Sequence, residues 1–178
     1  LDHRVGISFL TKGIIPERLF DLFEQFPEKI LAQIGLVSLS IGYWKGYEPN
    51  APPPEKRIEN IQKLRDVGIL PEIKVDPIIP FVTDREADVI NLFRQLKEAG
   101  VKRATLSYLH LRPAIQEQLM KGLLPLHQRL VESCFKTQEW KTVGSSSKTK
   151  LIPKSVRERG YQRFREIGER FGIATSVC

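Results

Sequence analysis

The sequence has 178 residues, of which 41% are hydrophobic and 28% charged, so it can form one globular core and is unlike a disordered chain. No apolar run approaches the roughly 18 residues of a membrane span, and two distant cysteines argue against a disulfide-stapled secreted protein. We expect a cytoplasmic protein with no membrane partner. Because the first residues, LDHRVGISFL, contain neither a leader nor an initiator methionine, we also expect a part of a longer chain.

The net charge of +7 and the pI near 9.5 permit contact with a polyanion such as nucleic acid, although many basic globular proteins have no such partner. Clustering of the basic residues late in the chain favours this partner. The cluster consists of Lys136, Lys141, Lys148, Lys150, Lys154, Arg157, Arg159, Arg163 and Arg165.

An amphipathic helix, a glycine and a short apolar strand recur around Gly35, Gly68 and Gly100. The intervals are 33 residues (68 − 35) and 32 residues (100 − 68), which suit a βα unit of a parallel sheet. Glycine suits the left-handed residue that ends a helix. The pattern predicts an α/β fold.

Four βα units are predicted in chain order. The helix from Pro54 to Val67 begins with a proline that favours the first turn, and Thr83 or Asp84 could cap the next helix. The expected strands cover residues 5–10, 36–41, 72–79 and 103–111, with a last strand or edge segment over 173–177.

The pattern changes near residue 125, so we divide the sequence into 1–125 and a C-terminal extension, 126–178. In the extension, the polar residues of about 137–150, which include GSSSKTK, predict a mobile loop. The spacing of apolar residues over 154–171 predicts a terminal helix that ends at Gly172.

Sites in parallel βα barrels lie at the carboxyl ends of the strands, which selects the polar residues where each expected strand meets its following loop. These groups are Thr11 and Lys12; Ser38 and Ser40; Glu48 with Arg57; Lys74, Asp76, Pro77 and Pro80; and Ser107, Tyr108, His110 and Arg112.

Two segments, EPNAPPPEKRIENIQKLRDVGI from Glu48 and VDPIIPFVTD ending at Asp84, resemble the C-terminal half of radical S-adenosylmethionine (SAM) enzymes of the spore photoproduct lyase-related group. LTKG at residues 10–13, VSLSI at 37–41 and YLHLRPA at 108–114 follow the order of that group. The similarity returns in the terminal RERGYQRFREIGERFGI segment.

The resemblance implies a partial (β/α)6 TIM-like barrel, here its last four βα units plus a C-terminal helical extension. In that family a C-x3-C-x2-C motif holds a [4Fe-4S] cluster, which takes an electron from a donor such as flavodoxin or ferredoxin. S-adenosyl-L-methionine is then cleaved, and a 5′-deoxyadenosyl radical abstracts hydrogen from the substrate. This sequence contains only Cys134 and Cys178, so we expect the cluster ligands upstream and the isolated chain to be inactive.

Positions matching the family suggest cofactor contacts. Lys12 resembles the residue that meets the carboxylate of S-adenosylmethionine, and Ser40 resembles a hydroxyl near its ribose. Glu48 and Arg57 either shape the cofactor lid or form an ion pair across the PNAPPP turn. Ile79 lies in a segment resembling the adenine side of the site.

Other candidates come from the strand pattern. Asp76 alternates with Lys74, and this pair is expected to line a pocket because buried charges need partners or a cavity. Tyr108, His110 and Arg112 also alternate, and together they could contact a nucleotide or phosphate of a DNA repair substrate.

The sequence identifies no catalytic residue and no metal ligand in this chain. Cys134 could donate hydrogen from its thiol but better fits an apolar core, and Cys178 has no assigned role. Two further functions stay open. One is a cluster-independent barrel lyase or aldolase with Lys12 or Lys74 as its amine nucleophile, and the other is a basic nucleic-acid-binding module.

Overall fold

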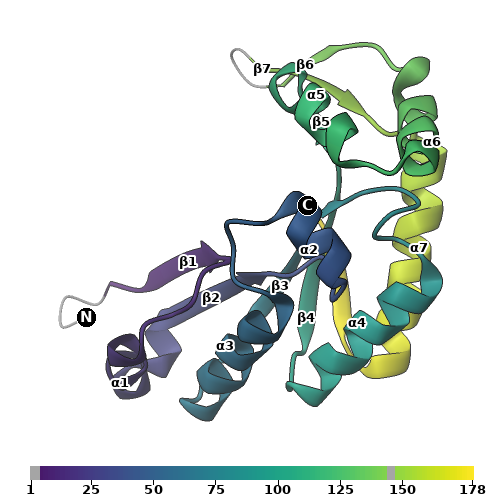
Figure 1. Ribbon diagram of the computed structural model, residues 1–178. Coiled ribbons are helices and arrows are strands. Elements are labelled where there is room, and N and C mark those ends of the chain that lie inside the picture. The colour runs from purple at the N-terminus through teal and green to yellow at the C-terminus, as the bar shows by residue number, and fades with distance from the viewer. Residues whose placement is uncertain (1–4, 144–146) are drawn as a thin grey trace.

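A computed structural model describes residues 5–143 and 147–178 and shows an α/β fold (Figure 1). The main sheet is parallel, with the strand order β1-β2-β3-β4-β8, and a small antiparallel sheet has the order β5-β7-β6. The strands are β1 Ile7–Thr11, β2 Ile30–Gly35, β3 Glu72–Ile78, β4 Arg103–Tyr108, β5 His110–Leu111, β6 Lys141–Val143, β7 Ser147–Leu151 and β8 Ala174–Val177. The helices are α1 Glu17–Gln25, the short 3-10 helix Pro27–Lys29, α2 Ile41–Tyr47, α3 Pro54–Asp66, α4 Glu86–Glu98, α5 Pro113–Gly122, α6 Pro125–Lys136 and α7 Lys154–Phe171.

The two faces of the main sheet differ in chemistry. Residues such as Ile34, Ile73 and Leu106 point to one face and are buried, and Figure 1 shows α1, α3, α4 and α7 gathered along one side of the sheet. The core continues between α4 and α7, where Phe93 and Phe164 pack edge to face with ring centroids 6.1 Å apart.

The other face is polar. The strand register aligns Gly35, Lys74, Thr105 and Ser176 across β2, β3, β4 and β8, so these four residues share this face. Two residues earlier on β2, β3 and β4, the same face carries the aligned side chains of Gln33, Glu72 and the exposed Arg103. Parallel sheets normally have both faces covered by apolar packing, so a polar face implies a different environment.

The predicted second strand is wrong. The strand lies at Ile30–Gly35, and residues 36–40 form a loop that leads into α2. Gly35 therefore ends a strand and not a helix. The alternating serines mark a helix start instead, because Ser40 is the N-cap of α2 and its Oγ accepts a hydrogen bond from Tyr43 N at 3.2 Å.

Other helix boundaries follow the prediction. The helix expected from Pro54 is α3, and the terminal helix is α7, which ends at Gly172 with a φ of 69°. Gly68 and Gly100 also have positive φ, 83° and 86°, as expected for glycines that end helices.

The predicted cap of α4 is wrong, because Arg85 occupies the N-cap position and makes no side-chain cap hydrogen bond. Thr83 and Asp84 instead bond back into the loop that follows β3. Thr83 Oγ1 accepts from Ile79 N at 2.8 Å, and Asp84 Oδ1 accepts from Phe81 N at 2.6 Å.

The expected strand over 103–111 divides into two. The part that belongs to the main sheet ends at Tyr108, and His110 begins β5 in the small sheet. The predicted shared face of Tyr108, His110 and Arg112 is therefore wrong, since Tyr108 is buried while the other two residues are exposed.

The C-terminal segment returns to the main sheet. Helix α7 packs on α4, and β8 pairs in parallel with β4 at the edge of the sheet, which confirms the last strand expected over 173–177. Within 137–150, β6 and β7 pair where a loop was expected, and residues 144–146 of that segment lie outside the described residues. The division at residue 125 stays a prediction.

The α/β class is confirmed, whereas the partial barrel stays a prediction. Among the helices of the described residues, none is both long and apolar enough to span a bilayer.

Candidate functional site

A charged network lies at the carboxyl ends of β1 and β2. Lys12 directly follows β1, and its Nζ is 2.6 Å from Oε1 of Glu48, the residue that ends α2. The other carboxylate oxygen, Oε2, is 2.6 Å from Nη1 of Arg57 in α3. Glu48 thus bridges two cations, which confirms the predicted pairing of Glu48 with Arg57 across the turn.

Backbone geometry fixes this network. Gly35 provides room for Lys12, because a Cβ at position 35 would lie 2.7 Å from Lys12 Cγ. Arg57 donates from Nε to Pro52 O at 3.0 Å and from Nη1 to Gly35 O at 3.1 Å. The guanidinium therefore joins the proline-rich turn to the end of β2.

Arg57 retains an unused donor. Its side chain is only 1% exposed, and Nη2 is buried without a hydrogen-bond partner among the described residues. Two cations share one carboxylate, so the network has a formal charge of +1. A buried cation with an unmet donor is costly, and an anionic acceptor would relieve that cost.

Asn60 of α3 holds the loop after β1 and was missed by sequence reasoning. Its Oδ1 accepts from Ile15 N at 3.2 Å, and its Nδ2 donates to Gly13 O at 2.7 Å. Both ends of the amide are thus occupied by the backbone that follows Lys12. The only signal was an asparagine inside a helix, a position where such side chains often bond to backbone.

A cavity of about 380 Å³ adjoins the network. It brings Lys12 together with Lys74 and Asp76, which confirms that the alternating pair lines a pocket. Lys74 Nζ also lies 3.3 Å from Sγ of the exposed Cys178, a neighbour that the sequence did not indicate. The full lining is Leu10, Thr11, Lys12, Gly35, Lys74, Asp76 and Pro77.

Below this cavity the polar sheet face contains a hydrogen-bonded carboxylate. Glu72 accepts from Gln33 Nε2 at 3.1 Å and from the Thr105 hydroxyl, and Thr105 Oγ1 lies 3.1 Å from Ser176 Oγ. Burial acts to raise the pKa of Glu72, but the bonds from Thr105 and Gln33 and the positive charge of Lys74 outweigh it, so the pKa is lowered.

The remaining predicted site residues lie elsewhere. Ser40 is exposed at the start of α2, whereas Ile79 is buried in the core, and its backbone N–H and C=O bond to Thr83. His110 is exposed in β5, and Arg112 is exposed at the N-cap of α5. The cavity beside Lys12 does not include these four residues.

Tyr108 belongs to a buried network that joins β4, α7 and the loop after β3. Its hydroxyl donates to Asp84 Oδ2 at 2.8 Å, and Arg163 Nη1 donates to Asp84 O at 3.0 Å. Burial, followed by the negative charge of Asp84, raises the pKa of Tyr108. A substrate contact through the Tyr108 side chain is not available while it stays in this position.

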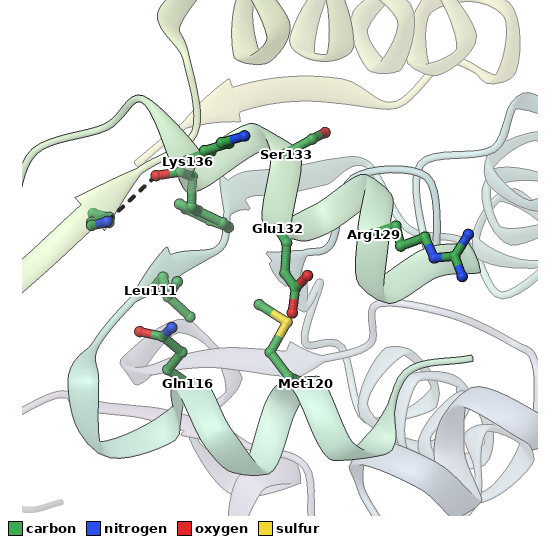
Figure 2. Close-up of a pocket in the computed structure, with 9 residues that line it drawn as sticks. Leu111, Gln116, Met120, Arg129, Glu132, Ser133 and Lys136 are labelled. Carbon is green, nitrogen blue, oxygen red and sulfur yellow. Dashed lines mark hydrogen bonds between the residues drawn. The ribbon is translucent and has the colours of Figure 1, made fainter. Parts of the chain in front are cut away.

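A second cavity, of about 560 Å³, lies between α5, α6 and the small sheet (Figure 2). Figure 2 shows Glu132 directed toward Met120 while Arg129 points away, and Lys136 and Lys150 also line the groove. None of the predicted site residues lines it. Over residues 5–143 and 147–178, no three His, Cys, Asp or Glu side chains are grouped to hold a metal ion.

Comparison with solved structures identifies the fold. Spore photoproduct lyase superposes with a TM-score of 0.75 over 97% of this chain and 50% of its own, at 15% sequence identity. One of its structures contains bound S-adenosylmethionine and a dinucleoside spore photoproduct. The radical S-adenosylmethionine methyltransferase TsrM from Kitasatospora setae is more distant, with a TM-score of 0.51 and 12% identity over 93% of this chain and 35% of its own.

Sequence comparison gives a consistent result. A radical SAM Nα-GlyT isomerase of Pseudomonas phage M6 is 24% identical over 176 residues, which are 97% of this chain and 35% of that protein. An uncharacterized protein of Methanocaldococcus jannaschii is 34% identical over 88 residues, which are 48% of this chain and 33% of that protein. No family model matches the sequence. The chain spans about a third of the length of the curated relatives that it matches. The predicted resemblance to the radical SAM spore photoproduct lyase group is confirmed at the level of fold.

Proposed function

We propose that this chain forms part of a radical SAM enzyme and binds S-adenosyl-L-methionine at the carboxyl ends of β1, β2 and β3. The observation that carries the proposal is the network of Lys12, Glu48 and Arg57, in which two cations share one carboxylate and Lys12 lines the adjoining cavity. The carboxylate of an amino acid matches the positive charge that this network presents through Lys12.

The polar sheet face supports a partial barrel. In a barrel, one face of the sheet packs on the surrounding helices while the other faces the lumen. Here the apolar face is covered by helices, and the opposite face carries Gln33, Glu72, Lys74, Thr105 and Ser176. We infer that this polar face is part of the lumen wall of a (β/α)6 barrel, where polar side chains meet substrate or water.

The residues present fit the cofactor in part. Lys12 would hold its carboxylate, while the buried Arg57 would act through Glu48, which positions the Lys12 ammonium. Asp76 would line the pocket beside the carboxylate, and Ser40 offers an exposed hydroxyl. When bound, S-adenosylmethionine would supply a 5′-deoxyadenosyl radical for hydrogen abstraction. Ile79 would support the pocket wall from within the core. The described residues contain no ligand set for a [4Fe-4S] cluster, so we assign this chain no role in holding one.

We propose that the substrate is a nucleic acid and that the enzyme is a DNA repair lyase. Its electrons would come from a donor protein such as flavodoxin or ferredoxin. The net charge of +7 and the fold shared with spore photoproduct lyase, which binds a dinucleoside photoproduct, support this choice. His110 and Arg112 are exposed and are available for contacts with phosphate.

The test uses the complete natural protein, reconstituted anaerobically with iron and sulfide, and measures both S-adenosylmethionine affinity and reductant-dependent 5′-deoxyadenosine. Replacing Lys12 with Ala should weaken cofactor binding about tenfold or more, since a charge-assisted hydrogen bond contributes about 1.5–3 kcal/mol. Lys56→Ala is the matched control, because Lys56 is exposed and pairs only with Glu59 among the described residues. Equal affinity of the Lys12→Ala variant and the wild type would refute the assigned site, and absence of 5′-deoxyadenosine would refute the enzyme class.

A further inference from the structure

Helix α5 lacks the apolar cover that most helices of a folded protein have. It is ten residues long, and none of its residues is buried. Ile115 is exposed, and Leu119 and Met120 are only half-buried. A helix this short gains most of its stability from packing of its apolar face, so an uncovered face is costly. Uncovered apolar surface of this kind marks a site of interaction with a partner.

A groove between α5 and α6 continues this apolar surface. Two cavities, of about 560 and 480 Å³, lie along it, and Met120 lines both. The buried Leu111 and Phe135 line the larger cavity, so its inner part is apolar (Figure 2). At the turn between the two helices, Leu124 and Leu126 are 67% and 66% exposed. We call the groove and this turn the α5–α6 surface.

The α5–α6 surface is also positively charged. Arg129, Lys136 and Lys150 line the larger cavity, and Glu132 is its one carboxylate among the described residues. None of the three cations forms an ion pair within residues 5–143 and 147–178. Arg129 and Lys136 are exposed, so both are available at the rim. An apolar centre with a basic rim fits a partner whose own surface is apolar and acidic.

This combination favours a protein over a nucleic acid. Phosphate groups are recognised by cations and hydrogen-bond donors and need no apolar groove. Stacking of bases needs an accessible aromatic ring, but Phe135, the aromatic residue that lines the groove, is buried. Methionine and arginine are enriched in protein interfaces, and Met120 and Arg129 line this groove.

The size of the surface restricts the partner further. Helices of 10 and 12 residues are about 15 and 18 Å long, so the two side by side offer about 18 by 20 Å, or roughly 360 Å². Stable complexes bury about 800 Å² per partner, whereas transient electron-transfer complexes bury less than about 600 Å² per partner. The α5–α6 surface therefore suits a transient encounter.

The surface adjoins the proposed cofactor site. Tyr47 Oη in α2 donates to Gly122 O at the end of α5, at 3.0 Å. The residue that follows Tyr47 is Glu48, which bridges Lys12 and Arg57. Figure 1 shows α5 and α6 beyond the carboxyl ends of the main-sheet strands. A partner on this surface would therefore bind at the same end of the strands as the cofactor.

We propose that the α5–α6 surface is the docking surface for an acidic electron-donor protein. The inference rests on the proposed function, which requires such a donor, and adds the place where the donor binds. Apolar side chains of the donor enter the groove, and its carboxylates face the basic rim.

The test measures the affinity of flavodoxin, an acidic electron donor, for the complete natural protein at low and high ionic strength. Lys136→Glu reverses one rim charge. It should weaken binding about three- to tenfold at low ionic strength and less at high ionic strength, because salt screens rim charges. Lys97→Glu is the matched control and should bind as wild type. Like Lys136, Lys97 is an exposed lysine in the last turn of a helix, but it lies in α4 and lines neither cavity.

Met120→Gln tests the apolar part of the surface. Methionine and glutamine have similar helix propensities, so the melting temperature of the variant should stay near that of wild type. Loss of the apolar contact should weaken flavodoxin binding about fivefold at both ionic strengths.

Equal affinity of Lys136→Glu and Lys97→Glu, or no binding of flavodoxin by the wild type, would overturn the inference. Weaker binding of a thymidine oligonucleotide by Lys136→Glu, with flavodoxin binding unchanged, would assign the surface to nucleic acid instead. The same preparations are assayed for 5′-deoxyadenosine with dithionite, a reductant that needs no docking surface. Formation of that product without flavodoxin binding would refute the docking surface alone. Its absence would refute the proposed function and, with it, the choice of an electron donor.

Discussion

Replacement of Gly160 by Ala tests the buried network most directly. Gly160 lies within α7, and a Cβ built there would lie 1.8 Å from the Tyr108 hydroxyl oxygen and 2.6 Å from Cζ. Tyr108 is 1% exposed, so it has no free space into which to move. The variant must therefore shift α7 or displace the phenol from Asp84.

The magnitude follows from three opposing effects. Overpacking a core costs about 1–3 kcal/mol. Loss of a hydrogen bond to a carboxylate adds about 1.5–3 kcal/mol. Replacing glycine by alanine inside a helix returns about 1 kcal/mol. Gly160→Ala should therefore lower the free energy of unfolding by about 1.5–5 kcal/mol.

Urea denaturation followed by circular dichroism provides the assay, and a midpoint lower by roughly 1–2 M at an unchanged slope is expected. Gly46→Ala in α2 is the matched control, because a Cβ there meets no atom within 4 Å. That variant should be as stable as wild type or more stable by up to about 1 kcal/mol. Equal gains for Gly160→Ala and Gly46→Ala would refute the tight contact between α7 and Tyr108.

Three further variants test the site. Glu48→Gln should lower the free energy of unfolding by about 3–5 kcal/mol, because Arg57 loses its buried anionic partner, and an unchanged urea midpoint would contradict the network. Asn60→Ala should lower it by about 1–3 kcal/mol through the loss of two buried hydrogen bonds to backbone, which the same titration measures. Glu72 has a pKa below the ordinary 4.5 in the folded chain, so its stabilisation is present above that value and is lost as pH falls through the lower folded-state pKa. The stability difference between wild type and Glu72→Gln should consequently shrink as pH falls below 4.5, and a difference independent of pH would contradict the assignment.

Local sequence signals were sufficient to predict the helices and strands whose ends they mark. Helix α3 begins with prolines and ends before a glycine with positive φ, and α7 ends at Gly172 in the same way. These features act within a few residues, so they could be identified without knowledge of the fold. Strand β3 was placed correctly for a similar reason, since its apolar run follows directly after such a helix.

The errors have a different origin. Gly35 and the serines after it fit two structures. In the predicted one, Gly35 ends a helix and the serines lie in a strand; in the observed one, Gly35 ends a strand and Ser40 caps the following helix. The local sequence pattern does not distinguish the two. Tyr108 was assigned to substrate because its alternation was extended across Leu109, where the chain leaves the main sheet for the small one. In both cases the pairing of strands within the sheets, and not the local sequence, determined where the strand lies.

In the site, pairs close in sequence were easier to foresee than distant ones. Glu48 and Arg57 flank one turn, so their ion pair could be expected, and the alternation of Lys74 and Asp76 indicated a shared pocket. Cys178 lies 104 residues from Lys74, and its approach depends on β8 joining the sheet beside β4. No local pattern carries that information.

The contact of Lys12 with Gly35 couples two positions on neighbouring strands. The lysine stem crosses the bare backbone of Gly35 to reach Glu48, so a methyl group at position 35 would push the ammonium away from its partner. Homologous chains with a larger residue at position 35 should therefore carry a shorter or differently directed side chain at position 12. Evolution at these two positions is expected to proceed by paired replacement, with each change tolerated only in the background of the other.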